Sequence, residues 1–191
     1  MPRTNDANKL IKDERKQSII SAALPLFVLY GDKVSVDMIC EKAKCSHGLL
    51  YHYFKDANNV FQTIKKSERF LSLQTTLLDY VDNGSQIDAI YQMISNVNSA
   101  VLKVKNDDVS ILYLVLNNHE KISFKSSLAS LVKEGQKNGQ VTAGKPEDLV
   151  SIYINYLSGV LLKKVLQKSY KIEIQPIDNL MQIFIKKTAR I

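Results

Sequence analysis

The sequence predicts an all-α fold, and three observations lead to this class. Apolar residues recur every three or four positions along most of the 191 residues, which is the spacing of helices. Seven glycines and four prolines are too few for a turn-rich all-β chain of this length. No segment has a convincing strand pattern. A content of 45% hydrophobic and 24% charged residues excludes wholesale disorder.

Capping residues predict where the N-terminal helices begin. A first helix covers about 13–30, and Gly31 is placed to end it. Ser, Thr, Asp and Asn side chains cap helices by accepting hydrogen bonds from free backbone amides. On this basis two short helices begin after Ser35 and Ser46, the second ending near residue 54. A long helix then begins after Asp56 and reaches about residue 81.

Larger helices joined by short polar breaks fill the rest of the chain. Serine and aspartate caps or a proline in the first turn mark their starts. The last helix is expected to run past its apolar stripe to Lys186, Lys187 and Arg190, whose charges suit a helix C-terminus. The five expected starts are Ser85, Asp107, Ser123, Pro146 and Pro176.

Charge and cysteine content narrow the class of protein further. The net charge of +7 is divided almost evenly, +4 in residues 1–66 and +3 in 67–191, so charge alone only hints at nucleic acid. Two cysteines cannot form a disulfide framework in a chain of this length. The N-terminus has no apolar signal-peptide core, and the longest apolar run, 111–116, is too short to span a membrane. We therefore expect a soluble, cytoplasmic protein.

Residues 35–54 are the most informative segment. A short helix, a tight turn and a second short helix form the helix-turn-helix pattern, whose second helix enters the DNA major groove. The spacing assigns one set of residues to a small core: Val36, Ile39, Cys40, Ala43, Cys45, Leu50 and Phe54. It leaves a second set facing outward: Ser46, His47, Gly48, Leu49, Tyr51, His52 and Lys55.

Together these features resemble the TetR family of bacterial transcriptional regulators. The resemblance covers about residues 12–72, and its order and spacing are more specific than any single motif. Beyond residue 72 the chain resembles the family only in length and helix content. The matching residues are Ala22-Ala23, Leu26-Phe27, Gly31, Ser35-Val36, Ile39, Ala43, Ser46 and the run 48–54.

The resemblance implies a domain organisation and a function. Residues 12–72 would form the helix-turn-helix DNA-binding domain, and residues 73–191 would bind a small-molecule effector and dimerise. The expected protein is a homodimeric repressor that binds a pseudo-palindromic operator and is released by its ligand. The main alternative is an interaction protein on the same scaffold that has lost specific DNA readout.

The expected DNA contacts combine this pattern with the chemistry of phosphate and base recognition. Lysines, hydroxyls and helix N-terminal amides suit phosphate oxygens, and a glycine lets a helix approach base edges. A solvated surface is the alternative for the lysines, and an N-terminal arm of Arg3, Lys9, Lys12, Arg15 and Lys16 could extend the contact. The expected DNA-binding residues are Lys33, Ser35, Lys44, Ser46, His47, Gly48, Leu49, Tyr51, His52 and Lys55, with Lys42 beside them.

The sequence also departs from the family pattern. Ala57 stands where family members usually have a lysine that opens the fourth helix, and Lys55 could substitute for it. His47 replaces a common lysine or arginine, and Leu49 a small or hydroxylated residue, which favours contact with a thymine methyl group. Pro25 lies inside the first helix and should kink it.

The last two helices are predicted to form the dimer interface, with an intrachain core as the alternative. The preceding helix is apolar on more than one face, so it needs a second partner. By resemblance, two such helices from each subunit would form a four-helix interface. Its expected residues are Ile152, Tyr156, Gly159, Val160, Ile177, Leu180, Met181, Phe184 and Ile185.

An effector pocket is predicted among the middle helices, again with core packing as the alternative. Its apolar lining with a few hydroxyls favours a neutral or aromatic small molecule. The candidate lining residues are Tyr91, Ile94, Tyr113, Asn117, Phe124, Tyr153 and Tyr156.

Other functional classes have weaker support. Cys40, Cys45, His47 and His52 do not have standard zinc spacing, and the helix-turn-helix pattern directs the cysteines and histidines to opposite faces. A thiol redox switch stays open beside ordinary core packing of the cysteines. No nucleotide-binding or catalytic motif occurs, and His119-Glu120 lacks the second histidine of a metalloprotease. We expect no metal, cofactor or enzymatic activity.

Overall fold

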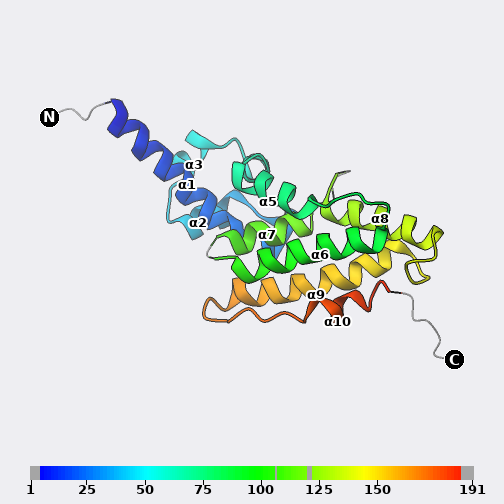
Figure 1. Ribbon diagram of the computed structural model, residues 1–191. Helices are drawn as coiled ribbons and strands as arrows, with labels where there is room; N and C mark the ends of the chain where they lie inside the picture. Colours follow the sequence, from blue (N-terminus) through cyan, green and yellow to red (C-terminus); the bar gives the residue numbers. More distant parts are fainter. Residues whose placement is uncertain (1–4, 106, 120–121, 186–191) are drawn as a thin grey trace. The chain divides into compact units, whose positions relative to one another are not determined.

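The chain folds into helices in two compact units (Figure 1). The computed structural model describes residues 5–105, 107–119 and 122–185. Over these ranges there is no named strand, and a single isolated bridge joins Val141 to Ile185. The first unit ends at Ser67 and the second begins at Glu68. The predicted all-α class is confirmed.

The first unit is a small helical domain. Helix α1 packs against α2 and α4, and α2 packs against α3. Its core includes Ile39 and Leu50, both fully buried, and the rings of Phe27 and Phe61 lie 4.9 Å apart. The elements are α1 (Asn5–Tyr30), η1 (Gly31–Lys33), α2 (Val36–Ala43), α3 (His47–Tyr53) and α4 (Ala57–Lys65).

Three side chains cap the helices of this unit as the sequence predicts. The Oγ of Ser35 accepts a hydrogen bond from the amide of Met38, and that of Ser46 accepts one from the amide of Leu49, both at 3.2 Å. The carboxylate of Asp56 accepts from the amide of Asn59 at 2.7 Å. Each cap satisfies an amide that the first turn of a helix leaves unpaired, so these starts are fixed locally. Helix α1, by contrast, begins well before residue 13 and continues through Pro25.

The prediction of one helix from Asp56 to about residue 81 is wrong, because the helix is interrupted at Ser67. Both the amide and the hydroxyl of Ser67 donate to the carbonyl of Ile64, at 3.0 and 2.6 Å. These bonds span three residues and replace the α-helical bond of four residues, so α4 ends at Lys65. Helix α5 (Glu68–Leu78) begins the second unit.

The second unit is a larger helical bundle. Helix α6 packs against α8, and α9 packs against both α7 and α8. The side chains of Phe124 and Tyr153 are fully buried where these helices meet, with ring centroids 6.4 Å apart. The long helices after α5 are α6 (Gln86–Lys103), α7 (Asp108–Leu116), α8 (Phe124–Lys137) and α9 (Pro146–Leu166).

The last helix is much shorter than predicted within the described residues. Helix α10 (Ile177–Met181) begins after Pro176 as expected, but turns follow it. The carbonyl of Phe184 accepts from the amide of Thr142 at 2.8 Å, and Ile185 forms the bridge to Val141. Phe184 is fully buried against Tyr153, so tertiary packing overrides the helical pattern. Lys186, Lys187 and Arg190 lie outside the described residues.

Helix α9 is long and apolar enough, by length and composition alone, to cross a membrane. Core helices of soluble proteins pass the same test. One face of α9 is buried in the bundle through Val150, Tyr153, Leu157 and Leu161. Ile152, on another face, is 56% exposed.

Candidate nucleic-acid interface

The two helices of the predicted helix-turn-helix separate apolar from polar residues. Ile39, Cys40, Leu50 and Phe54 are buried in the first unit, while Val36, Ala43 and Cys45 are half-buried. The second predicted set is exposed except for Leu49, which is half-buried. The outward surface of α3 therefore consists of Ser46, His47, Gly48, Tyr51 and His52, with Lys55 just beyond its end.

Backbone hydrogen bonds hold the turn between α2 and α3. The amide of Cys45 donates to the carbonyl of Cys40 at 3.0 Å, and the amide of Lys44 donates to that of Glu41 at 3.2 Å. These two bonds define a Schellman motif, which ends a helix by reversing the chain. The residue between the helices, Lys44, adopts the left-handed conformation with φ 52° that this motif requires.

Lys44 is the single non-glycine residue with positive φ in the described part of the chain. Glycine is the usual residue at this point of the motif, because an L side chain there costs about 1–2 kcal/mol. The lysine is exposed, so burial of apolar surface does not repay this cost. Strained residues are concentrated at functional sites, which makes Lys44 a candidate for a role outside folding.

Gly48 is a second residue whose identity is not explained by packing, because the fold has room for a side chain at this position. It lies within α3 with ordinary helical φ, and a Cβ added there would approach nothing closer than the Oγ of Ser46, at 4.0 Å. Glycine inside a helix costs roughly 0.5–1 kcal/mol relative to alanine. The glycine leaves space on the outer surface of α3.

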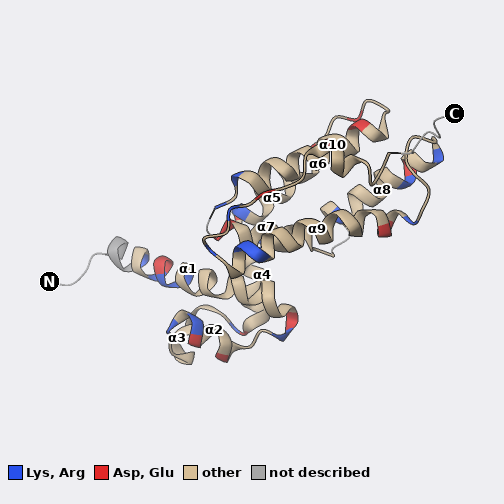
Figure 2. Cartoon of the chain, turned by 90° about the horizontal axis from the view of Figure 1, so that it is seen from below, with Lys and Arg blue, Asp and Glu red and all other residues tan. Residues whose placement is uncertain are grey.

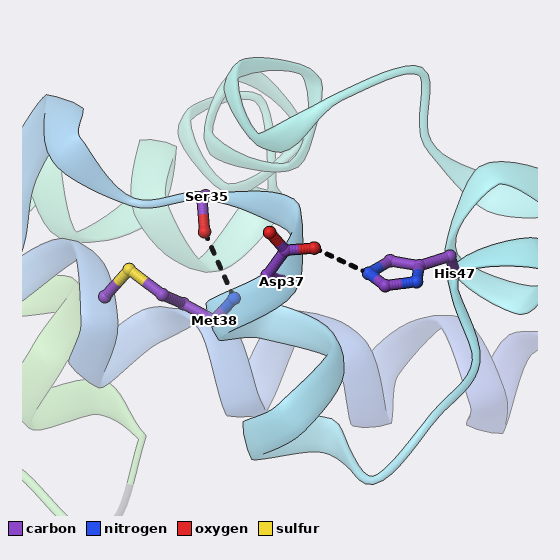
Figure 3. A network of polar contacts seen from close by, with 4 residues as sticks. All are labelled: Ser35, Asp37, Met38 and His47. Carbon is purple, nitrogen blue, oxygen red and sulfur yellow. Dashed lines mark hydrogen bonds and ion pairs between the residues drawn. The ribbon is translucent and has the colours of Figure 1, made fainter.

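A polar contact joins the starts of the two helices (Figure 3). The Nε2 of His47 lies 2.7 Å from Oδ1 of Asp37. Asp37 is in the first turn of α2 and His47 is the first residue of α3. Both side chains are exposed, at 57% for His47 and 84% for Asp37. His47 is thus already engaged on one ring nitrogen, which sequence reasoning did not anticipate.

Most of the remaining candidates are exposed. Lys33, Lys42, Lys44 and Lys55 are exposed. Tyr51 is 57% exposed, and the ring of His52 stands edge-on to that of Tyr53 with centroids 4.9 Å apart. Of the proposed arm, Lys16 is half-buried over the ring of Phe54, whereas Lys9, Lys12 and Arg15 are exposed and Arg3 is outside the described residues. Figure 2 shows basic residues along both units with acidic residues among them.

The cysteines and histidines of the segment do not converge. Cys40 is buried and Cys45 half-buried, whereas His47 and His52 are exposed. Over the described ranges, no three His, Cys, Asp or Glu side chains are placed to hold a metal ion. Burial raises the pKa of the Cys40 thiol to about 11, and a hydrogen bond with Cys45 contributes. Cys40 therefore stays protonated at neutral pH.

Two features of the site were missed from the sequence. The contact of Asp37 with His47 joins residues ten positions apart on different helices, and no periodicity indicates it. The left-handed conformation at Lys44 was missed because the turn contains no glycine. The one sequence feature that could have indicated the contact is that Asp37 is a charged residue in the first turn of a capped helix.

The predicted dimer residues fall into two groups. On α9, Ile152 and Gly159 are exposed, and Tyr156 and Val160 are half-buried. Near α10, Leu180, Met181 and Phe184 are buried in their own chain, with 5%, 3% and 0% exposure. Burial of these three side chains in their own chain is what the intrachain alternative expects. Ile177 is half-buried and Ile185 is 38% exposed.

The predicted pocket residues differ in burial and in their partners. Ile94, Phe124 and Tyr153 are fully buried, and the Tyr153 hydroxyl is 3.3 Å from Oδ1 of Asn98, so these residues are core. Asn117 donates to Oγ of Ser158 at 2.9 Å, and Tyr113 is half-buried. The hydroxyl of Tyr156 accepts a hydrogen bond from the amide of Gln175 at 2.7 Å. Tyr91 lines an open cavity of about 340 Å³ with Met181 and Ile185.

The comparison with protein families identifies the first unit. Residues 19–63 match the family model described as bacterial regulatory proteins, tetR family. This range contains α2, the turn and α3. The resemblance to the TetR family is therefore confirmed, and the chain has a TetR-family fold with an N-terminal helix-turn-helix domain. TetR-family regulators are in general non-enzymatic transcription factors.

Solved structures share the fold over nearly the whole chain. A HlyIIR mutant protein with an alanine-substituted segment has a TM-score of 0.57 at 14% identity, covering 98% of this chain and 100% of that one. A TetR-family regulator from Haemophilus influenzae, HI0893, has 0.52 at 16% identity, covering 92% and 99%. AibR in complex with isovaleryl coenzyme A and operator DNA has 0.51 at 12% identity, covering 88% and 94%. No curated protein sequence matches the chain.

Proposed function

We propose that this protein is a cytoplasmic transcriptional repressor that binds a pseudo-palindromic operator as a homodimer and is released by a small-molecule effector. The observation that carries the proposal is the exposed polar surface of α3, set on a helix-turn-helix whose segment matches the TetR family. Such a helix reads base edges in the major groove while flanking lysines bind phosphates.

Lys44 and Gly48 support DNA contact because each lowers the stability of the fold and yet would favour binding of a DNA duplex. The lysine occupies a backbone conformation that favours glycine, which places a positive charge in the turn. The glycine leaves open space on α3 where the protein itself would tolerate a side chain. We propose that Lys44 serves to bind a phosphate and that Gly48 lets α3 come close to base edges.

The homodimer is proposed from the exposed side of α9 and from the family resemblance. Ile152 is 56% exposed, and a Cβ added at Gly159 would meet no atom within 4 Å. Both residues lie on a different face of α9 from its buried residues. An apolar helix that buries only one of its faces in the monomer needs another partner. The interface would therefore depend on α9 more than on the short α10.

The effector is proposed to bind within residues 73–191, which is what the resemblance to the family implies. The buried aromatic residues Phe124 and Tyr153 fill the core, so the site would lie elsewhere, and Tyr91 remains a candidate lining residue. AibR, whose fold is similar, was solved with isovaleryl coenzyme A and operator DNA. A thermal-shift screen of neutral and aromatic compounds would identify ligands that stabilise this protein.

The test of DNA binding starts from a pool of random duplexes. The purified protein should enrich a pseudo-palindromic sequence, and its affinity should fall steeply with salt because lysine–phosphate contacts release counterions. Gly48→Ala should keep or raise the melting temperature, since alanine favours helix, yet weaken operator binding by about tenfold. A variant that melts higher and binds as tightly would contradict the role of Gly48.

Failure to retain any duplex at low salt would remove the DNA-binding proposal. The interaction protein predicted as the alternative would then be favoured, and Ala57 is the sequence departure that leaves it open. Release of the enriched duplex by a ligand found in the thermal-shift screen would support the repressor mechanism. Tighter binding in its presence would contradict release.

A further inference from the structure

The contact between His47 and Asp37 determines which atom of the histidine ring is free. Oδ1 of Asp37 lies 2.7 Å from Nε2, a distance for a strong hydrogen bond (Figure 3). A carboxylate accepts hydrogen bonds and donates none, so Nε2 has to carry the proton of the pair. Nδ1 is left as the ring atom that can meet another molecule.

The backbone around the pair is fixed on both sides. Ser35 caps α2 through its bond with the amide of Met38, and Asp37 lies between them in sequence. Ser46 caps α3 directly before His47, and the Schellman bonds hold the turn between the helices. The two side chains therefore project from ends that are held by hydrogen bonds of their own, so the contact orients the imidazole and is not needed to form the turn.

We propose that Asp37 is a positioning residue for sequence readout: it orients His47 and fixes the Nε2–H tautomer, so that the neutral ring presents Nδ1 as a hydrogen-bond acceptor to DNA. This inference rests on the proposed DNA-binding function. In the major groove, the donors that such an acceptor can meet are the N4 amino group of cytosine and the N6 amino group of adenine. Guanine and thymine present acceptors at the equivalent edge and would be disfavoured.

The tautomer can be measured in the free protein without DNA. Long-range proton–nitrogen spectra of uniformly labelled protein, at a pH where the imidazole is neutral, distinguish Nε2–H from Nδ1–H. The signal is assigned by its loss in His47→Gln, which separates it from the other two histidines. The wild type should show Nε2–H at His47, and Asp37→Asn should lose this bias because an amide can both donate and accept.

The effect on readout is measured by repeating the duplex selection with variants. Asp37→Asn should relax the preference at one base pair of each half-site by roughly 3- to 10-fold, which is the range that one hydrogen bond carries. Glu41→Gln is the matched control, because it removes an exposed charge from the same helix without touching His47. It should change affinity for all sequences alike and leave the profile unchanged.

A double-mutant cycle separates positioning from a general effect of the substitution. With His47 changed to alanine, Asp37→Asn should have no further effect on the profile, since the residue it positions is gone. A wild-type ring without the Nε2–H bias overturns the inference, as does a profile that Asp37→Asn leaves unchanged. Absence of DNA binding by the wild type overturns the proposed function instead, and the tautomer measurement still tells whether Asp37 orients the ring.

Discussion

At Lys44 a single residue carries opposing demands from folding and from the proposed function. Lys44→Gly should raise the free energy of unfolding by about 1 kcal/mol, because glycine adopts positive φ without steric cost. It should also weaken DNA binding, and the slope of log K against log salt concentration should fall in magnitude by about 1, the contribution of one phosphate contact. Denaturant titration and binding isotherms at several salt concentrations measure the two effects.

Lys44→Ala separates the backbone effect from the charge. Alanine removes the ammonium group but retains the side-chain clash of the left-handed conformation, so it should lose the same affinity without gaining stability. Equal stability of the glycine and alanine variants would show that the turn relaxes out of this conformation. Unchanged affinity in both would exclude Lys44 from the interface.

Cys40 predicts a pH dependence of stability on the alkaline side. Burial raises the pKa of its thiol from the ordinary value of 9.0 to about 11. Between these values the unfolded chain loses the proton while the folded protein keeps it, so the free energy of unfolding decreases as pH rises from about 9 to about 11. Below pH 9 both states are protonated and the contribution is fully present.

Cys40→Ala is the control for this decline. Tyr153, whose pKa is also raised by burial, destabilises the fold at high pH in both proteins, so the difference between them isolates Cys40. Urea titrations at pH 8, 9, 10 and 11 should show a steeper loss in the wild type. Parallel curves would mean that the thiol ionises in the folded state as easily as in the unfolded one.

At the scale of elements, Gly135 allows α8 to meet the segment after it. Its carbonyl accepts from the amides of Gln140 and Val141 at 2.8 and 3.1 Å. A Cβ at this position would collide with the side chain of Val141, which is buried and stiff at χ1. Gly135→Ala should therefore destabilise the protein by about 1–3 kcal/mol, the usual cost of overpacking.

Gly159→Ala is the matched control, since it adds the same methyl group inside α9 in open space. In the monomer this variant should be more stable by about 0.5–1 kcal/mol, because alanine favours helix over glycine. Thermal unfolding at low protein concentration measures both changes. A stabilised Gly135→Ala variant would show that Val141 moves aside easily.

At the scale of the whole molecule, the exposed side of α9 predicts the oligomeric state. Ile152→Lys should shift the protein from dimer to monomer, because it places a charge in the centre of the proposed apolar interface. Leu102→Lys is the matched control on α6, where the leucine is 59% exposed and outside that interface. Sedimentation velocity distinguishes the states. Dissociation by both substitutions, or by neither, would contradict the assignment to α9.

The fold class and most helix starts could be predicted because they depend on local chemistry. Caps such as Ser46 and Asp56 act within four residues, and the apolar spacing of α2 and α3 determines their buried sides. The short α10 could not be predicted, because Phe184 joins the core through residues over 30 positions away. The Asp37–His47 contact and the conformation of Lys44 likewise depend on how two helices meet.

The Schellman turn between α2 and α3 is closed by main-chain bonds, and α3 is anchored to the core through Leu50. The outward residues of α3 therefore contribute little to the stability of the fold, so substitutions there should change stability only slightly. Libraries at positions 47, 48, 51 and 52 should therefore yield folded variants, and under the proposed function these variants would bind new operators. The same freedom would let duplicated copies of such a gene diverge in target while keeping one architecture.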